Sequence, residues 1–132
     1  MKRKFSLTIE LPAPPEAIYK AWLSSSGHSA MTGSPAKVEP RVGGKFTAWD
    51  GYISGKTLEL EPYSQIVQAW RTGEFGEADP DSRIELTLKA VRGGNSTRLT
   101  LNHAEIPKGQ SASYESGWEE WYFTPMRDYF SK

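Results

Sequence analysis

The sequence of 132 residues contains no cysteine and only two histidines, His28 and His103. The absence of cysteine excludes disulfides, thiolate nucleophiles and cysteine-ligated zinc or iron–sulfur sites. It is compatible with a reducing compartment. Two isolated histidines without a cysteine partner do not form a transition-metal motif. We therefore expect neither a metal site nor a cofactor.

The chain also lacks a surplus of charge and a long apolar run. Its 16 basic and 16 acidic side chains give a formal net charge of zero, whereas proteins that bind a phosphate backbone usually carry a basic surplus. No stretch is long and apolar enough to span a bilayer, and the alternating start of the chain lacks the apolar block of an export signal. We expect a soluble, cytoplasmic protein that does not bind nucleic acid.

What the chain has in quantity is aromatic rings, with 5 Trp, 6 Tyr and 5 Phe. Each ring covers a large area, so a few of them can line a core or a cavity. The length suits one domain, which we expect to comprise residues 1–132.

The first half of the chain reads as one strand, one or two short helices and then more strands. Residues 5–11 alternate apolar and polar, which predicts a half-buried strand. The prolines that follow precede a helix over 15–24, because proline is well tolerated in a first helical turn. A second short helix is predicted over 26–31. Further strands are predicted at 36–41, 45–50, 52–61, 65–71, 83–90 and 99–103, with a hairpin signal at residues 50–51.

The C-terminal part changes to a helical period. A helix is predicted over 111–130, with Ser111 or Ser113 as its cap and a kink or break at Pro125. One side of it carries Tyr114, Trp118, Trp121, Tyr122, Pro125 and Tyr129. One helix can cover an antiparallel sheet only if the sheet curls around it.

Gly43 and Gly44 precede a strand in which Phe46 and Ala48 are predicted to face inward and Trp49 outward. Paired glycines beside a strand favour a bulge or a corner where the sheet bends. A phosphate-binding loop is the alternative, but no helix follows to present its N-terminus. The sequence therefore predicts an α+β fold in which a curved antiparallel sheet of about six strands wraps around the long C-terminal helix.

Five segments occur in order along the chain: "VEPRVGGKF", "DGYISGKTLELEP", "IVQAWR", "RLTLNH" and "GWEEWY". Together they resemble the SRPBCC, or START-like, superfamily, and more closely the family named after the activator of the heat-shock-protein-90 ATPase. The resemblance implies the helix-grip fold with a cavity between sheet and helix. Eukaryotic members carry a further N-terminal domain that binds the chaperone, and we expect this chain to lack it. The positions that match the family's pattern are Arg41, Gly43, Gly44, Trp70, Arg71, Gly117 and Trp118, and none of them is a catalytic signature.

The candidate site is the cavity between the sheet and the helix, because ligand cavities are mostly apolar with a few polar groups. His103 shares a strand face with Leu99 and Leu101 and is interpreted as a core histidine or a polar group that orients a ligand. His28 is interpreted as a surface residue. The predicted lining comprises Trp22, Phe46, Ala48, Trp70, Ile84, Leu86, Leu99, His103, Trp118 and Tyr122. Each of them has core packing as its simpler interpretation.

Residues 73–77 read either as a plain hairpin connection or as a mobile lid that carries an exposed Phe75. Among the scattered carboxylates, only Asp50 is a candidate for an inward position. No Gly-x-Ser-x-Gly elbow occurs, so no catalytic residue is assigned.

Three functions follow from these observations. The first is the binding of a hydrophobic or amphipathic small molecule in the cavity. The alternative is a co-chaperone-like interaction module, which would use exposed aromatic residues such as Trp49 or Phe75. An enzyme ranks third, since it needs convergent polar groups inside the cavity. A monomer and a homodimer are both left open.

Overall fold

The computed structural model describes residues 3–131; Met1, Lys2 and Lys132, the ends of the predicted domain, lie outside the described residues. Seven strands form one antiparallel sheet in the order β1-β7-β6-β5-β4-β3-β2. The strands are β1 (Phe5–Leu11), β2 (Lys37–Val38), β3 (Lys45–Ala48), β4 (Ile53–Glu61), β5 (Gln65–Thr72), β6 (Ser82–Val91) and β7 (Ser96–Ala104). The helices are α1 (Pro15–Trp22), α2 (Ser25–Thr32), α3 (Ser111–Trp118) and α4 (Thr124–Phe130).

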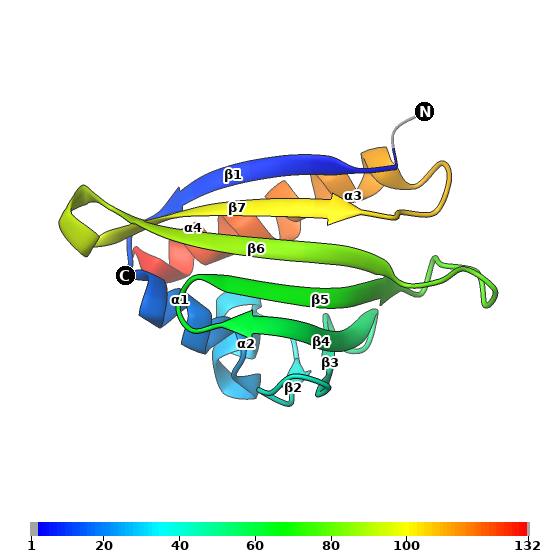
Figure 1. Cartoon of the computed structure of the whole chain (residues 1–132), viewed down its shortest axis with the longest axis horizontal. Coiled ribbons are helices and arrows are strands. Elements are labelled where there is room, and N and C mark those ends of the chain that lie inside the picture. Colours follow the sequence, from blue (N-terminus) through cyan, green and yellow to red (C-terminus); the bar gives the residue numbers. More distant parts are fainter. Residues whose placement is uncertain (1–2, 132) are drawn as a thin grey trace.

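Figure 1 shows the helices together on one face of the curved sheet, with the C-terminal helical segment along β1, β7 and β6. This is the predicted helix-grip arrangement of a sheet around a C-terminal helix. Among residues 3–131, no helix is long and apolar enough to cross a membrane.

The two short helices after β1 form where the sequence predicts them. Pro15 occupies the first turn of α1, and the hydroxyl of Ser24 accepts the backbone N–H of Gly27 at 3.1 Å at the start of α2. Gly33 ends α2 in the left-handed conformation, with φ of 80°. These caps satisfy backbone groups that a short helix leaves unpaired.

The C-terminal segment differs in detail from the prediction. It begins after Gln110 without a side-chain cap, so the predicted cap at Ser111 or Ser113 is wrong. A π-helical turn, Glu119–Phe123, joins α3 to α4, and the N–H of Thr124 bonds to the carbonyl of Glu119 five residues back. Pro125 follows at once. Since proline cannot donate a backbone hydrogen bond, the helix adapts to it by widening one turn instead of breaking.

Gly43 and Gly44 form a corner at the start of β3. The N–H of Gly43 bonds to the carbonyl of Thr57, and the N–H of Thr57 bonds to the carbonyl of Gly44. A register shift in β4 follows directly, between Thr57 and Glu59. A bulge of this kind increases local twist and bends the strand. The glycine pair therefore lies where the sheet curves toward the helices.

Candidate functional site: an aromatic cleft between sheet and helix

A cleft of about 360 Å³ lies between the sheet and the C-terminal helical segment. Strands β4 and β5 and the turn between β3 and β4 contribute Trp49, Tyr52, Ile53, Trp70 and Thr72. The helical segment contributes Ser113, Tyr114, Gly117, Trp118, Trp121 and Tyr122. Seven of these eleven residues are aromatic and none is charged. We call this set the aromatic cleft.

The turn between β3 and β4 places Trp49 in the aromatic cleft. Trp49 and Asp50 both adopt positive φ, 52° and 57°, which interrupts the alternation of the strand. The Trp49 ring therefore packs edge-on against Trp121 and Tyr122, with ring centroids 5.6 Å and 6.4 Å away, and the predicted outward position is wrong. Asp50 is exposed, so it is not the inward carboxylate that the sequence left as a candidate.

The π-helical turn shapes the opposite wall. Trp118 and Tyr122 are buried, whereas Trp121 is 54% exposed and stands with the exposed Tyr52 among the cleft residues. Helical spacing groups Trp121 with Trp118 and Tyr122 on the aromatic side of the predicted helix. The extra residue of a π turn changes that spacing, so Trp121 lies at the mouth of the cleft instead.

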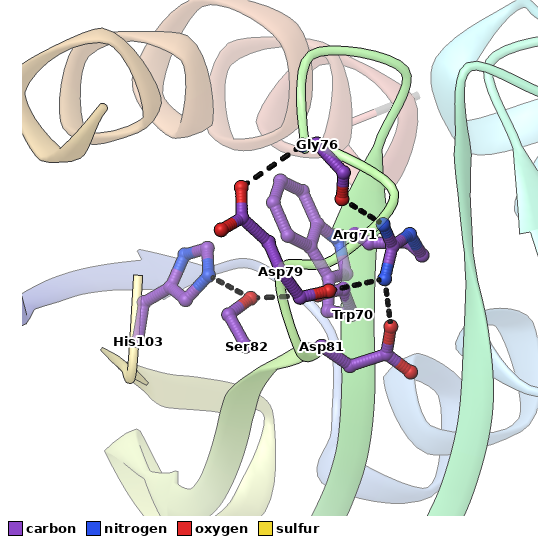
Figure 2. A network of polar contacts seen from close by, with 7 residues as sticks. All are labelled: Trp70, Arg71, Gly76, Asp79, Asp81, Ser82 and His103. Carbon is purple, nitrogen blue, oxygen red and sulfur yellow. Dashed lines mark hydrogen bonds and ion pairs between the residues drawn. The ribbon is translucent and has the colours of Figure 1, made fainter. Parts of the chain in front are cut away.

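His103 holds the Trp118 ring in place from behind the cleft. The indole N–H of Trp118 donates to Nδ1 of His103 at 3.1 Å. Ser82 donates its hydroxyl hydrogen to the carbonyl of Trp70 at 2.7 Å, so its oxygen accepts from Nε2 of His103 at 2.8 Å (Figure 2). These partners fix the neutral imidazole with its proton on Nε2. Burial lowers the pKa of His103 to about 3.

His28 does the same for Tyr122, and the prediction that it lies at the surface is wrong. Helix α2 turns the ring inward, where it is 1% exposed. Its Nδ1 donates to the carbonyl of Trp22 at 2.9 Å, so Nε2 accepts the hydroxyl of Tyr122 at 2.7 Å. Burial lowers the pKa of His28 and raises that of Tyr122. Both rings therefore stay neutral at physiological pH.

A chain of hydroxyl groups crosses from the sheet to the start of α3. Tyr114 donates to Oε1 of Gln110 at 2.6 Å, so it accepts from the hydroxyl of Thr72 at 2.7 Å. Among the described residues, the indole nitrogen of Trp49 is the one buried side-chain polar atom without a hydrogen-bond partner. An unpaired buried donor is costly, and this one belongs to a residue of the cleft wall.

The loop after β5 is fixed to the sheet by Arg71. Its guanidinium donates to Asp81 at 2.8 Å and to the carbonyls of Asp79 and Gly76, each at 3.0 Å (Figure 2). Phe75 is only 7% exposed, because it packs beneath this guanidinium and near the Trp70 ring. The expectation of an exposed Phe75 is therefore wrong.

The predicted site residues divide into three groups. Trp70, Trp118 and Tyr122 line the aromatic cleft. Trp22 and His103 lie behind it, in ring contact with Trp118. The rest are buried in the core away from the cleft: Phe46, Ala48, Ile84, Leu86 and Leu99.

Sequence reasoning left the other cleft residues out of the predicted lining. Tyr114 and Trp121 were identifiable, because both belong to the aromatic side of the predicted helix. Gly117 occurs in the matching "GWEEWY" segment, but a glycine gives no sign that it faces a cavity. Within the described part of the chain, no group of three or more His, Asp or Glu could hold a metal ion.

Residues 12–131 match the family model described as Activator of Hsp90 ATPase homolog 1-like protein. Activator of 90 kDa heat shock protein ATPase homolog 1 from Homo sapiens is 28% identical over 96% of this chain and 37% of its own length. The activator homolog from Dictyostelium discoideum is 27% identical over 98% of this chain and 33% of its own. The chain thus spans about a third of the length of these curated relatives.

Solved structures share the whole architecture. An HSP90 activator from Plasmodium falciparum is 28% identical, with a TM-score of 0.85 and coverage of 93% of this chain and 92% of that one. CalU16 from Micromonospora echinospora is 25% identical, with a TM-score of 0.79 over 97% of this chain and 76% of that one. The family match extends over nearly the whole sheet and the complete C-terminal segment, and the chain belongs to the family of Activator of Hsp90 ATPase homolog 1-like proteins.

Proposed function

We propose that this protein binds an uncharged, largely apolar small molecule in the aromatic cleft and acts in the cytoplasm. The observation that carries the proposal is the cleft itself, a space of about 360 Å³ with seven aromatic residues and no charged one in its lining. Ligand sites in proteins are typically of this size and this apolar character, with a few polar groups for orientation.

The walls of the cleft are held in position by groups that do not face the ligand space. His103 and His28 accept hydrogen bonds from Trp118 and Tyr122, so these two rings cannot collapse into the cleft without leaving a buried polar atom unpaired. Such pre-organisation favours affinity, because little side-chain freedom is lost on binding. The hydroxyls of Ser113 and Tyr52, two exposed residues of the lining, are the polar groups that would orient a ligand.

Gly117 offers a direct test, because it lines the cleft from the last turn of α3. An added Cβ would meet no atom closer than Cδ1 of Trp121 at 3.8 Å. Leucine at this position therefore projects into the cleft without a backbone clash. Gly117→Ala is the matched control, since it improves helix propensity by about 1 kcal/mol but fills little space.

The measurement is a fluorescence titration with N-phenyl-1-naphthylamine, a neutral apolar probe, detected by energy transfer from the cleft tryptophans. Wild type and Gly117→Ala should bind alike, and Gly117→Leu should lose binding by at least about tenfold while unfolding no earlier than wild type. Equal binding by all three proteins would place the probe elsewhere and count against the proposal.

A second candidate function is contact with a heat-shock-protein-90 homologue, which the relatives' names support. The structural match covers 92% of the chain of the HSP90 activator from Plasmodium falciparum. A chain of similar length is therefore described as an HSP90 activator in that case. The exposed rings of Trp121 and Tyr52 are suited to a protein contact. The test is the ATPase rate of the cell's own chaperone homologue with and without this protein; no binding and no change in rate would exclude it.

A further inference from the structure

The two edges of the sheet differ in how well they are protected against pairing with another strand. At one edge, β2 is only two residues long, and Pro40 follows shortly after it. At the other edge, β1 has seven residues and pairs with β7 in continuous register from Phe5 to Leu11. Natural edge strands are usually blunted by shortness, proline, bulges or charge. Strand β1 has charge near its two ends and Pro12 directly after it, but it is long, and it contains neither a proline nor a bulge.

Figure 1 shows β1 as the outermost strand on its side of the sheet. The outward-facing side chains Ser6 and Thr8 are exposed, and Leu7 on the opposite face is half-buried. Among the described residues, the backbone bonds of this strand run to β7, except that the carbonyl of Leu11 at its end accepts from Ala13; just before the strand, the carbonyl of Arg3 accepts from Ile106. The outer row of β1 backbone groups is therefore available to another strand.

The sequence of β1 is self-complementary when a second copy runs antiparallel to it. With Leu7 opposite Leu7, Ser6 lies opposite Thr8 and Lys4 lies opposite Glu10. Shifting the register by two residues so that Glu10 lies opposite Ser6 removes this pairing of opposite charges. A shift that pairs odd with even positions would set apolar side chains against polar ones on the wrong face.

We propose that two copies of this chain associate through antiparallel pairing of their β1 strands about a twofold axis at Leu7. The twofold axis produces the Lys4–Glu10 contact twice, as an isologous interface requires. Directly opposed residues in an antiparallel pair have Cβ atoms about 4.5–5.5 Å apart, which is within reach of these two side chains. The paired sheets continue into one another across the axis.

The association is expected to be weak. Seven residues a side bury less than a standard interface, whose partners contribute about 20–30 residues each. Glu10 is also paired with Arg92 of its own chain, an exposed contact that it can share or exchange. Self-association should therefore be visible at concentrations from tens of micromolar to millimolar and should weaken with added salt.

Charge reversal tests both whether a second copy of the chain pairs with β1 and in which register it does so. In sedimentation velocity over a concentration series, Lys4→Glu should weaken dimerisation by roughly tenfold or more, because it places two carboxylates opposite each other twice. The double variant Lys4→Glu/Glu10→Lys should restore it. A wild-type protein that stays monomeric at all concentrations would overturn the proposal, and so would a Lys4→Glu variant that dimerises as strongly as wild type.

Cysteine pairs provide a second readout, because the natural chain has no cysteine to interfere. Ser6→Cys and Thr8→Cys are both exposed and should leave the fold unchanged. An equal mixture of the two variants should form a disulfide-linked heterodimer under mild oxidation, since only opposed positions fall within disulfide range. Each variant alone should cross-link much less. Equal cross-linking in all three samples would contradict the register.

Discussion

The indole N–H of Trp118 donates to Nδ1 of His103 at 3.1 Å, across the boundary between the C-terminal helix and the sheet. Both residues are buried, His103 completely. The contact requires an imidazole that is unprotonated at Nδ1, because an indole nitrogen can only donate. The position of a cleft-lining ring is therefore tied to the protonation state of a core histidine.

Acid should destabilise the fold through His103. Burial lowers its folded-state pKa to about 3, while the unfolded chain titrates near the usual value of 6.5. Between these two values the unfolded state binds the extra proton. The stabilisation is therefore complete above about pH 6.5 and falls by about 1.4 kcal/mol per pH unit below it. Urea unfolding at pH 7, 6 and 5 measures this slope.

His28 contributes to the same slope with the same sign, because burial lowers its pKa too. A His28→Gln variant should keep the part of the pH dependence of unfolding that arises from His103. A His103→Gln variant should keep the part that arises from His28. A free energy of unfolding that stays flat from pH 7 to pH 5 would show that neither histidine is held neutral by the fold.

The two glycines at the corner before β3 should respond differently to alanine. Gly43 has φ of 85° and open space around its Cα, so Gly43→Ala should cost about 1–2 kcal/mol of backbone strain. At Gly44 an added Cβ would lie 2.6 Å from the carbonyl oxygen of Glu39. Gly44→Ala must move backbone and should cost about 3 kcal/mol or more. Chemical denaturation distinguishes the two, and equal costs would argue against a tight corner.

Replacing Arg71 by lysine should loosen the loop over residues 73–81. Lysine cannot reproduce the three contacts that the planar guanidinium makes with Asp81 and two loop carbonyls. We expect a loss of about 1–2 kcal/mol and faster amide hydrogen exchange confined to the loop. Arg83→Lys is the control, because its ion pairs with Glu59 and Glu85 are partly exposed and long. If both variants exchange alike, Arg71 does not fix the loop.

The sheet and the C-terminal helix could be predicted from the sequence because each has a regular period. The alternation in β1 and β6 and the helical spacing from Tyr114 to Tyr129 follow from burial of one face. The buried position of Ile84, Leu86 and Leu99 was predictable for the same reason. Patterns of this kind record which side of an element faces the core, and they do so over many residues at once.

The aromatic cleft was less predictable because local geometry overrides these periods at its walls. Two consecutive positive φ angles turn Trp49 inward, and the π turn moves Trp121 outward. His28 lies in a stretch of serines and glycine without apolar periodicity, and only the packing of α2 against Trp22 and Tyr122 reveals its role. Phe75 is buried by a cation above its ring, a contact that no sequence pattern announces.

The most direct test of the proposed function is native mass spectrometry of the protein after incubation with a small-molecule extract of its own host. Wild type and Gly117→Ala should each show the same added mass, corresponding to one bound small molecule per chain. Gly117→Leu should show the mass of the protein alone. Bare spectra for all three proteins, or the same added mass on Gly117→Leu, would contradict ligand binding in the aromatic cleft.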